Sequence, residues 1–166
     1  MKNPKPLISI IIVNWNSGNL LREAIASIEE NSYKVFEIII VDNASNDDSI
    51  YGIIQKPSLR IIKNNVNKGF GKGCNQGLRK ASGDFILFFN PDAKLFNDTL
   101  MRSLNFMLEN QNVGILGVKL VDEDGKTTHS CSRFPSFYNY LFDALGLSKF
   151  SPKLFKPATM MNDWDH

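Results

Sequence analysis

Residues 84–92 read Asp-Phe-Ile-Leu-Phe-Phe-Asn-Pro-Asp, and this stretch is the most informative in the chain. Every position from Phe85 to Phe89 is apolar, which predicts a strand buried between two layers of helices. Pro91 has no backbone N–H and a fixed φ, so it ends the strand and turns the chain toward the sheet edge. Asp92 then lies where α/β sheets bind ligands, and we expect it either to hold a metal or to cap the next helix.

On either side of this strand, apolar runs alternate with segments of helical periodicity. Strands are predicted at 7–13, 36–41, 59–62, 85–89 and 113–118. Helices are predicted after the first strand, near 46–48, over 72–81, and from Asn97 or Asp98 with an inner face of Leu100, Leu104, Met107 and Leu108. This order predicts an α/β fold with a mostly parallel sheet and helices on both faces. A hairpin turn is predicted at 121–126, with Gly125 at positive φ.

Composition narrows the class of protein. The chain has 166 residues, 43% of them hydrophobic and 22% charged, as in a soluble globular domain. A net charge of +2 with scattered basic residues argues against a nucleic-acid partner. Cys74 and Cys131 lie far apart in the sequence, which favours two unpaired thiols and a cytoplasmic location. The apolar run 7–13 is too short for a signal peptide or a membrane span.

Three predicted strands end in polar residues. The first ends in Asn14-Trp15-Asn16, the second in Asp42-Asn43 and the fourth in Asn90-Pro91-Asp92. The carboxyl ends of parallel strands share one edge of the sheet, so these side chains are expected to converge on one site.

Common phosphate and nucleophile motifs are missing. Neither G-x-G-x-x-G nor G-x-x-x-x-G-K-[ST] fits the glycines of residues 69–77, and there is no G-x-S-x-G. His129 and His166 are isolated. The Gly69-Phe70-Gly71-Lys72-Gly73 turn is either a tight loop before a helix or a backbone that passes close to a ligand.

Together these segments resemble the family 2 glycosyltransferases, inverting enzymes with the GT-A (Rossmann-like) fold. The likeness is greatest to rhamnosyltransferase-like bacterial members that build surface polysaccharides. It rests on residues 10–16, 40–47, 64–77 and 81–92, and continues through 117–120, 124–126 and 133–135. It covers residues 7 to about 135, in the order and spacing of the family.

The resemblance implies roles for individual residues. Asp42 would accept a hydrogen bond from a uracil or thymine imide, and the 67–77 loop would cover the nucleotide and its diphosphate. Asn90-Pro91-Asp92 takes the place of the family's D-x-D motif, with Asp92 as the ligand of Mg²⁺ or Mn²⁺. The residues expected to bind the donor nucleotide are Asn14, Trp15, Asn16, Asp42, Asn43, Asn67, Gly69, Gly71, Asn75 and Asn90.

The implied reaction is transfer of a sugar, with inversion, from a UDP- or dTDP-sugar to a saccharide or lipid-linked acceptor. The family's general base lies in a later acidic motif, so no catalytic residue is assigned within this chain. We therefore interpret the chain as an amino-terminal portion, which by itself is expected to bind a donor better than it turns one over. Residues 1–132 would form the nucleotide-sugar-binding core, and residues 133–166 would lead into the missing C-terminal part. A catalytically inactive binding module and a nucleotidyltransferase remain the alternatives.

The stretch 134–156 is rich in aromatic residues, with three lysines among them. One interpretation is apolar surface that packs on the remainder of the protein. The other is an interfacial segment that gives peripheral contact with the inner face of the plasma membrane, close to a lipid-linked acceptor.

Overall fold

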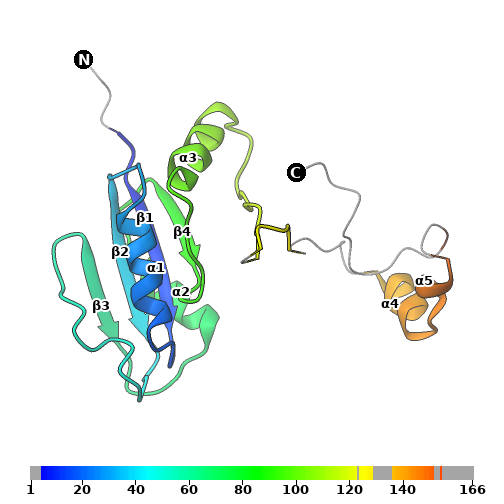
Figure 1. Ribbon diagram of the computed structural model, residues 1–166, viewed down its shortest axis with the longest axis horizontal. Helices are drawn as coiled ribbons and strands as arrows, with labels where there is room; N and C mark the ends of the chain where they lie inside the picture. Colours follow the sequence, from blue (N-terminus) through cyan, green and yellow to red (C-terminus); the bar gives the residue numbers. More distant parts are fainter. Residues whose placement is uncertain (1–4, 123, 129–135, 152–153, 155–166) are drawn as a thin grey trace. The chain divides into compact units, whose positions relative to one another are not determined.

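A computed structural model describes residues 5–122, 124–128, 136–151 and 154, with only the backbone of Ser148 (Figure 1). The chain divides into two compact units, residues 1–113 and 114–166, and each is considered by itself. The predicted division between residues 132 and 133 falls outside the described residues and stays a prediction.

The first unit is built on four parallel strands in the order β3-β2-β1-β4 (Figure 1). They are β1 (Ile8–Asn14), β2 (Phe36–Asp42), β3 (Leu59–Lys63) and β4 (Phe85–Phe89). The parallel sheet expected from the sequence is confirmed, and each of these strands lies within one residue of its predicted range. β1 and β2 are central and are buried at nearly every position, as β-branched, apolar strands covered on both faces should be.

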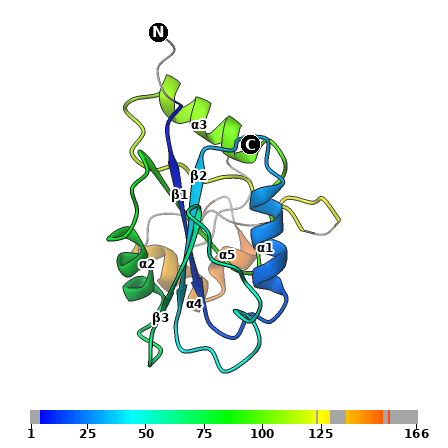
Figure 2. The ribbon, with the colours of Figure 1, turned by 90° about the vertical axis from the view of Figure 1, so that its left-hand side faces the viewer.

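Helices cover both faces of this sheet. Figure 2 shows α1 (Leu20–Glu29) and α2 (Phe70–Leu78) on opposite sides of the strands. α3 (Thr99–Glu109) shares the α1 face, because Leu100 and Leu104 belong to the same buried cluster as Leu21 of α1. The strands contribute Ile8, Ile10, Ile12, Ile38 and Ile40 to this cluster.

α2 packs unusually close to the other face, and glycines make this approach feasible. A Cβ added at Gly77 would lie 2.5 Å from Ile11 Cγ2, and one at Gly73 would lie 2.7 Å from Val13 Cγ1. Any side chain at these positions would push the helix off the strands.

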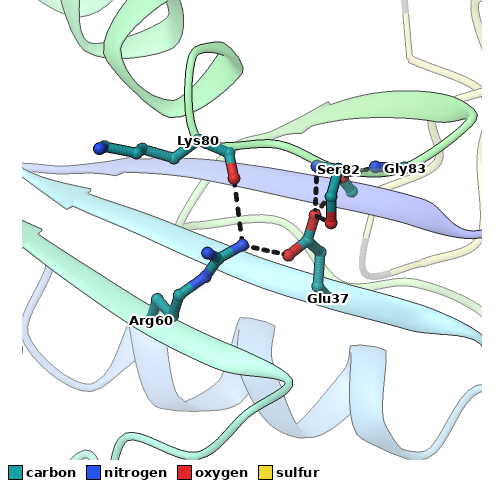
Figure 3. Close-up of polar contacts among 6 residues, drawn as sticks. Glu37, Arg60, Lys80, Ser82 and Gly83 are labelled. Carbon is teal, nitrogen blue, oxygen red and sulfur yellow. Dashed lines mark hydrogen bonds and ion pairs between the residues drawn. The ribbon is translucent and has the colours of Figure 1, made fainter.

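At the amino ends of the strands, a buried carboxylate ties four segments together (Figure 3). Glu37 of β2 accepts hydrogen bonds from Ser9 Oγ of β1 at 2.6 Å and from the N–H and Oγ of Ser82 at 2.7 and 2.8 Å. It also forms an ion pair with Arg60 of β3, which donates to the Lys80 carbonyl at 3.1 Å. Burial alone would raise the pKa of Glu37, but the hydrogen bonds and Arg60 outweigh it, so the pKa is lowered.

Two predicted elements, the strand at 113–118 and the helix near 46–48, do not form in the described residues. Residues 113–118 form no strand, and Ile115 is 92% exposed. An apolar run becomes a strand only where it pairs with a neighbouring backbone, and here the first described pairing comes later, between Val121 and Thr127. The helix predicted near 46–48 is instead a turn at residues 49–52 that ends at Gly52, whose φ is +75°.

Two predicted burial patterns are also wrong. β4 contributes one face to the core, where Phe89 is buried and its neighbours on that face are partly buried. Ile86 and Phe88 lie on the α2 side, at the sheet's edge, and are 37% and 49% exposed. In α3, Leu100 and Leu104 face the core as expected, but Leu108 is 47% exposed. Periodicity predicts which face of a helix or strand turns toward the core. It does not predict whether a neighbouring element is long enough to cover that whole face.

The second unit contains the predicted hairpin turn, confirmed by the antiparallel Val121–Thr127 bridge and a φ of +76° at Gly125. It also contains α4 (Phe137–Ala144) and α5 (Leu147–Phe150). None of the residues of α4 is buried, and Phe137, Tyr138 and Tyr140 are all more than half exposed. Among the described residues, no helix has the length and apolar character needed to cross a bilayer.

The close packing of α2 predicts that Gly77→Ala lowers the free energy of unfolding by about 1–3 kcal/mol, because the new methyl overlaps Ile11. Gly71→Ala is the matched control in the same helix, since a Cβ there meets nothing within 4 Å. We expect it to be neutral or slightly stabilising. Urea unfolding of both variants measures the difference, and equal stabilities would contradict the packing described.

The Glu37 cluster predicts that Glu37→Gln destabilises the protein by about 2–3 kcal/mol at neutral pH. Because the folded-state pKa is lowered, this contribution is complete above the unfolded-state pKa of about 4.3 and is lost as pH falls through the folded value. Unfolding free energies of wild type and variant should therefore converge in acid. Glu29→Gln, which breaks an exposed ion pair with Lys56, should change stability by less than about 1 kcal/mol.

Candidate functional site

The strand register brings the predicted polar strand ends to one edge of the sheet. Asn14 is the direct partner of Asp42 in the β1–β2 pairing. Asn90 follows Phe89, which pairs with Ile12 one strand over. The convergence expected from the sequence is therefore present at the carboxyl edge.

Asn14 joins the ends of β1 and β2 at this edge and is completely buried. Its Nδ2 lies 2.8 Å from Asp42 Oδ1, 3.0 Å from Ser45 Oγ and 2.8 Å from Ser49 Oγ. Its Oδ1 is buried and has no hydrogen-bond partner among the described residues. Asp42, 3% exposed, also accepts a bond from the Ser45 N–H at 3.3 Å.

The loops after β1 and β2 each contain a residue in the left-handed region. Asn16 has φ +52° and Ala44 has φ +61°, conformations that L-residues with a Cβ seldom adopt. Hydrogen bonds between the loops hold them there. The Asn16 N–H donates to Ser45 Oγ at 3.0 Å, and the Asn46 N–H donates to Asn16 Oδ1 at 2.9 Å.

A second polar node joins the ends of β2 and β3 to α2. Asn64, directly after β3 and 7% exposed, donates from Nδ2 to Asn43 Oδ1 and Gln76 Oε1, both at 2.9 Å. Its Oδ1 accepts from Gln76 Nε2 at 3.0 Å and from Lys68 Nζ at 2.9 Å. Both hydrogens and both lone pairs of this amide are therefore used.

The glycine-rich turn is held to the same network. Asn43 Nδ2 donates to the Gly69 carbonyl at 3.3 Å, and the Gly69 N–H donates to Asn67 Oδ1 at 2.8 Å. Gly69 has φ +82° and stands as the N-cap of α2, so the tight loop before a helix is confirmed. Whether its backbone also meets a ligand stays a prediction.

The remaining predicted residues differ in exposure. Trp15 is 58% exposed, and Asn75, Asn90 and Asp92 also reach solvent, whereas Asn43 is 2% exposed. Asp92 does not cap α3, whose N-cap is Asp98. Asn90 and Asp92 thus present one amide and one carboxylate to solvent, a donor set that fits Mg²⁺ or Mn²⁺ shared with substrate phosphates and water. The described residues contain no cluster of three His, Cys, Asp or Glu side chains able to hold a metal by themselves.

Sequence reasoning did not single out several residues of the network, among them Ser45, Ser49, Asn64 and Gln76. Asn64 could have been found, because it follows β3 as Asp42 ends β2, and the same strand-end rule applies to it. Ser49 and Gln76 lie within a turn and a helix, where no local pattern marks a side chain that faces a strand end.

The model of the Glycosyl transferase family 2 domain matches residues 9–161. The chain belongs to this family. An uncharacterized glycosyltransferase of Haemophilus influenzae is 39% identical over 112 residues, which cover 65% of this chain and 45% of the relative. The GalNAc(5)-diNAcBac-PP-undecaprenol beta-1,3-glucosyltransferase of Campylobacter jejuni is 32% identical over 135 residues, covering 76% and 42%.

Solved structures agree with this family 2 assignment. The structure of S. aureus TarS 1-349 in complex with UDP-GlcNAc matches with a TM-score of 0.58 and 27% identity, over 63% of this chain and 32% of that one. This match identifies the sheet and its helices as a GT-A fold. The chain spans about half the length of the curated family 2 relatives that it matches.

The Asn64 node predicts that Asn64→Ala loosens the glycine-rich turn of this family 2 domain. Losing four hydrogen bonds should lower the free energy of unfolding by about 2 kcal/mol and speed amide hydrogen exchange over residues 67–71. The control is Asn110→Ala, which removes one exposed bond to the Phe106 carbonyl and should change neither quantity appreciably. Unchanged exchange at 67–71 in Asn64→Ala would mean that the turn does not depend on this amide.

Proposed function

We propose that the chain is the donor-binding part of an inverting glycosyltransferase that uses a UDP- or dTDP-sugar and a divalent cation. The observation that carries the proposal is that polar side chains gather at the carboxyl edge of the sheet in this family 2 domain. Asn14 and Asp42 lie side by side there, and the exposed Asn90-Pro91-Asp92 turn comes directly after the adjacent strand. The complex of the similar TarS with UDP-GlcNAc supports a nucleotide-sugar as the ligand class.

The base and ribose would bind near the ends of β1 and β2. Asp42 keeps lone pairs beyond the two bonds that it accepts, and these could take the N–H of a uracil or thymine imide. Trp15, which follows Asn14 in the sequence and is exposed, offers an indole face on which a base can stack. The buried Asn43 would act indirectly, because its Nδ2 donates to the Gly69 carbonyl and so holds the glycine-rich turn in place.

The diphosphate would lie between the glycine-rich turn and the Asn90-Pro91-Asp92 turn. A Cβ at Gly71 meets nothing within 4 Å, so the backbone there is open to a ligand. Asp92 and Asn90 would hold Mg²⁺ or Mn²⁺, which supplies positive charge against the departing nucleoside diphosphate.

In the transfer step, the acceptor hydroxyl forms a bond to the anomeric carbon while the bond from that carbon to the diphosphate oxygen breaks. The electron pair leaves with the nucleoside diphosphate, and the hydroxyl proton passes to a general base. No residue of this chain is assigned as that base. The acceptor is a saccharide or a lipid-linked saccharide, the latter class suggested by the undecaprenol named for the Campylobacter relative. The exposed aromatic residues of α4 would favour peripheral contact with the inner face of the plasma membrane.

Calorimetric titration of UDP and dTDP, with Mn²⁺, Mg²⁺ or chelator, tests this proposal. We expect metal-dependent binding, and a loss of about tenfold or more in affinity in Asp92→Ala that chelator reproduces in wild type. Trp15→Ala should weaken binding with and without metal, by about 1–3 kcal/mol. Glu109→Ala, at the exposed end of α3, is the matched surface control. Folded protein that binds neither nucleotide would refute the donor site, and preferential binding of the triphosphates would favour a nucleotidyltransferase.

A further inference from the structure

We propose that Asn14 is a positioning residue for base recognition: its buried amide fixes the Asp42 carboxylate in the orientation that accepts the imide N–H of the base. This inference rests on the proposed function, because it requires Asp42 to meet the base. It assigns Asn14 a role through Asp42, since the completely buried side chain has no surface of its own to offer a nucleotide.

The orientation of the Asn14 amide is set by its surroundings. Nδ2 faces three oxygen acceptors and has two hydrogens to give. The carboxylate is the strongest of these acceptors, so one hydrogen goes to Asp42. Rotating the amide by half a turn would place its carbonyl oxygen against that carboxylate, and two oxygen acceptors would then repel each other.

The amide has this orientation although its oxygen has no donor among the described residues. A buried amide oxygen without a donor costs about 1–3 kcal/mol. Asn14 Oδ1 is in that state, while its nitrogen is surrounded by acceptors. The orientation of the amide is therefore set by the three acceptors around its nitrogen, of which Asp42 is the only charged one.

Asn14 also makes the shorter of the two hydrogen bonds that the Asp42 carboxylate accepts. Its bond to Asp42 Oδ1 measures 2.8 Å, whereas the Ser45 N–H lies 3.3 Å from Oδ2. Asn14 comes from a central strand fixed by the core, whereas Ser45 lies in the loop that begins at the left-handed Ala44. The plane of the carboxylate, and with it the direction of its free lone pairs, is set chiefly by Asn14.

The test compares UDP with N3-methyl-UDP, which lacks the imide hydrogen, on the full chain with Mn²⁺. Wild type should prefer UDP by about tenfold or more, and Asn14→Ala should lose most of that preference. Asn31→Ala is the matched control, because Asn31 is equally buried and donates to the Phe96 carbonyl away from the site. It should lower stability and leave the UDP to N3-methyl-UDP ratio unchanged.

Asn14→Asp gives a readout that structural damage alone would not produce. At about pH 8 two carboxylates face each other and UDP binds weakly. As pH falls toward about 5, the pair takes up one proton, whose O–H···O⁻ bond replaces the amide donor, so UDP affinity should recover. Lys63, the strand partner of Asp42, is present in every variant, as are Asp47 and Lys68 of the network. Wild type measured over the same pH range is therefore the control for their effects.

The outcomes separate this inference from the donor site itself. If wild type discriminates between the two ligands but the ratio persists in Asn14→Ala, or Asn14→Asp shows no recovery in acid, the positioning role is refuted alone. If wild type binds UDP without discriminating, the contact between Asp42 and the base is refuted as well. If it binds neither ligand, the proposed function fails. Should Asn14→Ala not fold, the nearly isosteric Asn14→Asp series decides.

Discussion

The hydrogen-bonded register of β1 and β2, which places Asn14 opposite Asp42, is the constraint on which the site depends. A slip of one residue would turn every side chain of a strand to the opposite face of the sheet. The polar pairs at the two ends oppose this, because a slip would separate Ser9 from Glu37 and Asn14 from Asp42. Ile10 and Ile12 pack in the core with α1, while Ile11 fits closely against Gly77 of α2. The hydrophobic core thus determines which side chains meet at the site, although no residue of the hydrophobic cluster takes part in it.

The two ends of the sheet are built differently. At the amino ends, Glu37 has a donor for each oxygen and a cation beside it, so its burial is fully compensated. At the carboxyl ends, Asn14 Oδ1 has no partner in the part of the chain that the structure describes, and Asn16 and Ala44 occupy the left-handed region. Unfavourable features gather at sites where geometry is selected for something besides stability. Their position supports the carboxyl edge as the functional one without reference to any relative.

The sequence predicted the four strands of the sheet because each is a short apolar run closed by polar residues or glycine, a pattern that depends on neighbours along the chain. It also placed Asn14, Asp42 and Asn90 on one edge, since parallel topology alone requires that. It did not predict that Asn14 would be buried or that the Asn64 amide would form four hydrogen bonds. The burial and the hydrogen bonds both depend on side chains from separate segments of the chain. The strand expected at 113–118 is absent for a related reason: apolar composition supplies propensity, but pairing needs a partner that composition cannot specify.

The part of the network that joins the ends of β2 and β3 to α2 consists mainly of neutral amides, and this has a chemical consequence. An amide both donates and accepts, so Asn43, Asn64 and Gln76 can join two strand ends to α2 without adding charge. Lys68, Lys72 and Asp92 are then charged residues within or next to the two turns between which a diphosphate is proposed to lie. With a single carboxylate in the Asn90-Pro91-Asp92 turn, a divalent cation would depend on phosphate oxygens for much of its coordination. Metal and nucleotide would therefore bind as a linked pair, each raising the affinity for the other, which is the behaviour expected when the cation serves the leaving group.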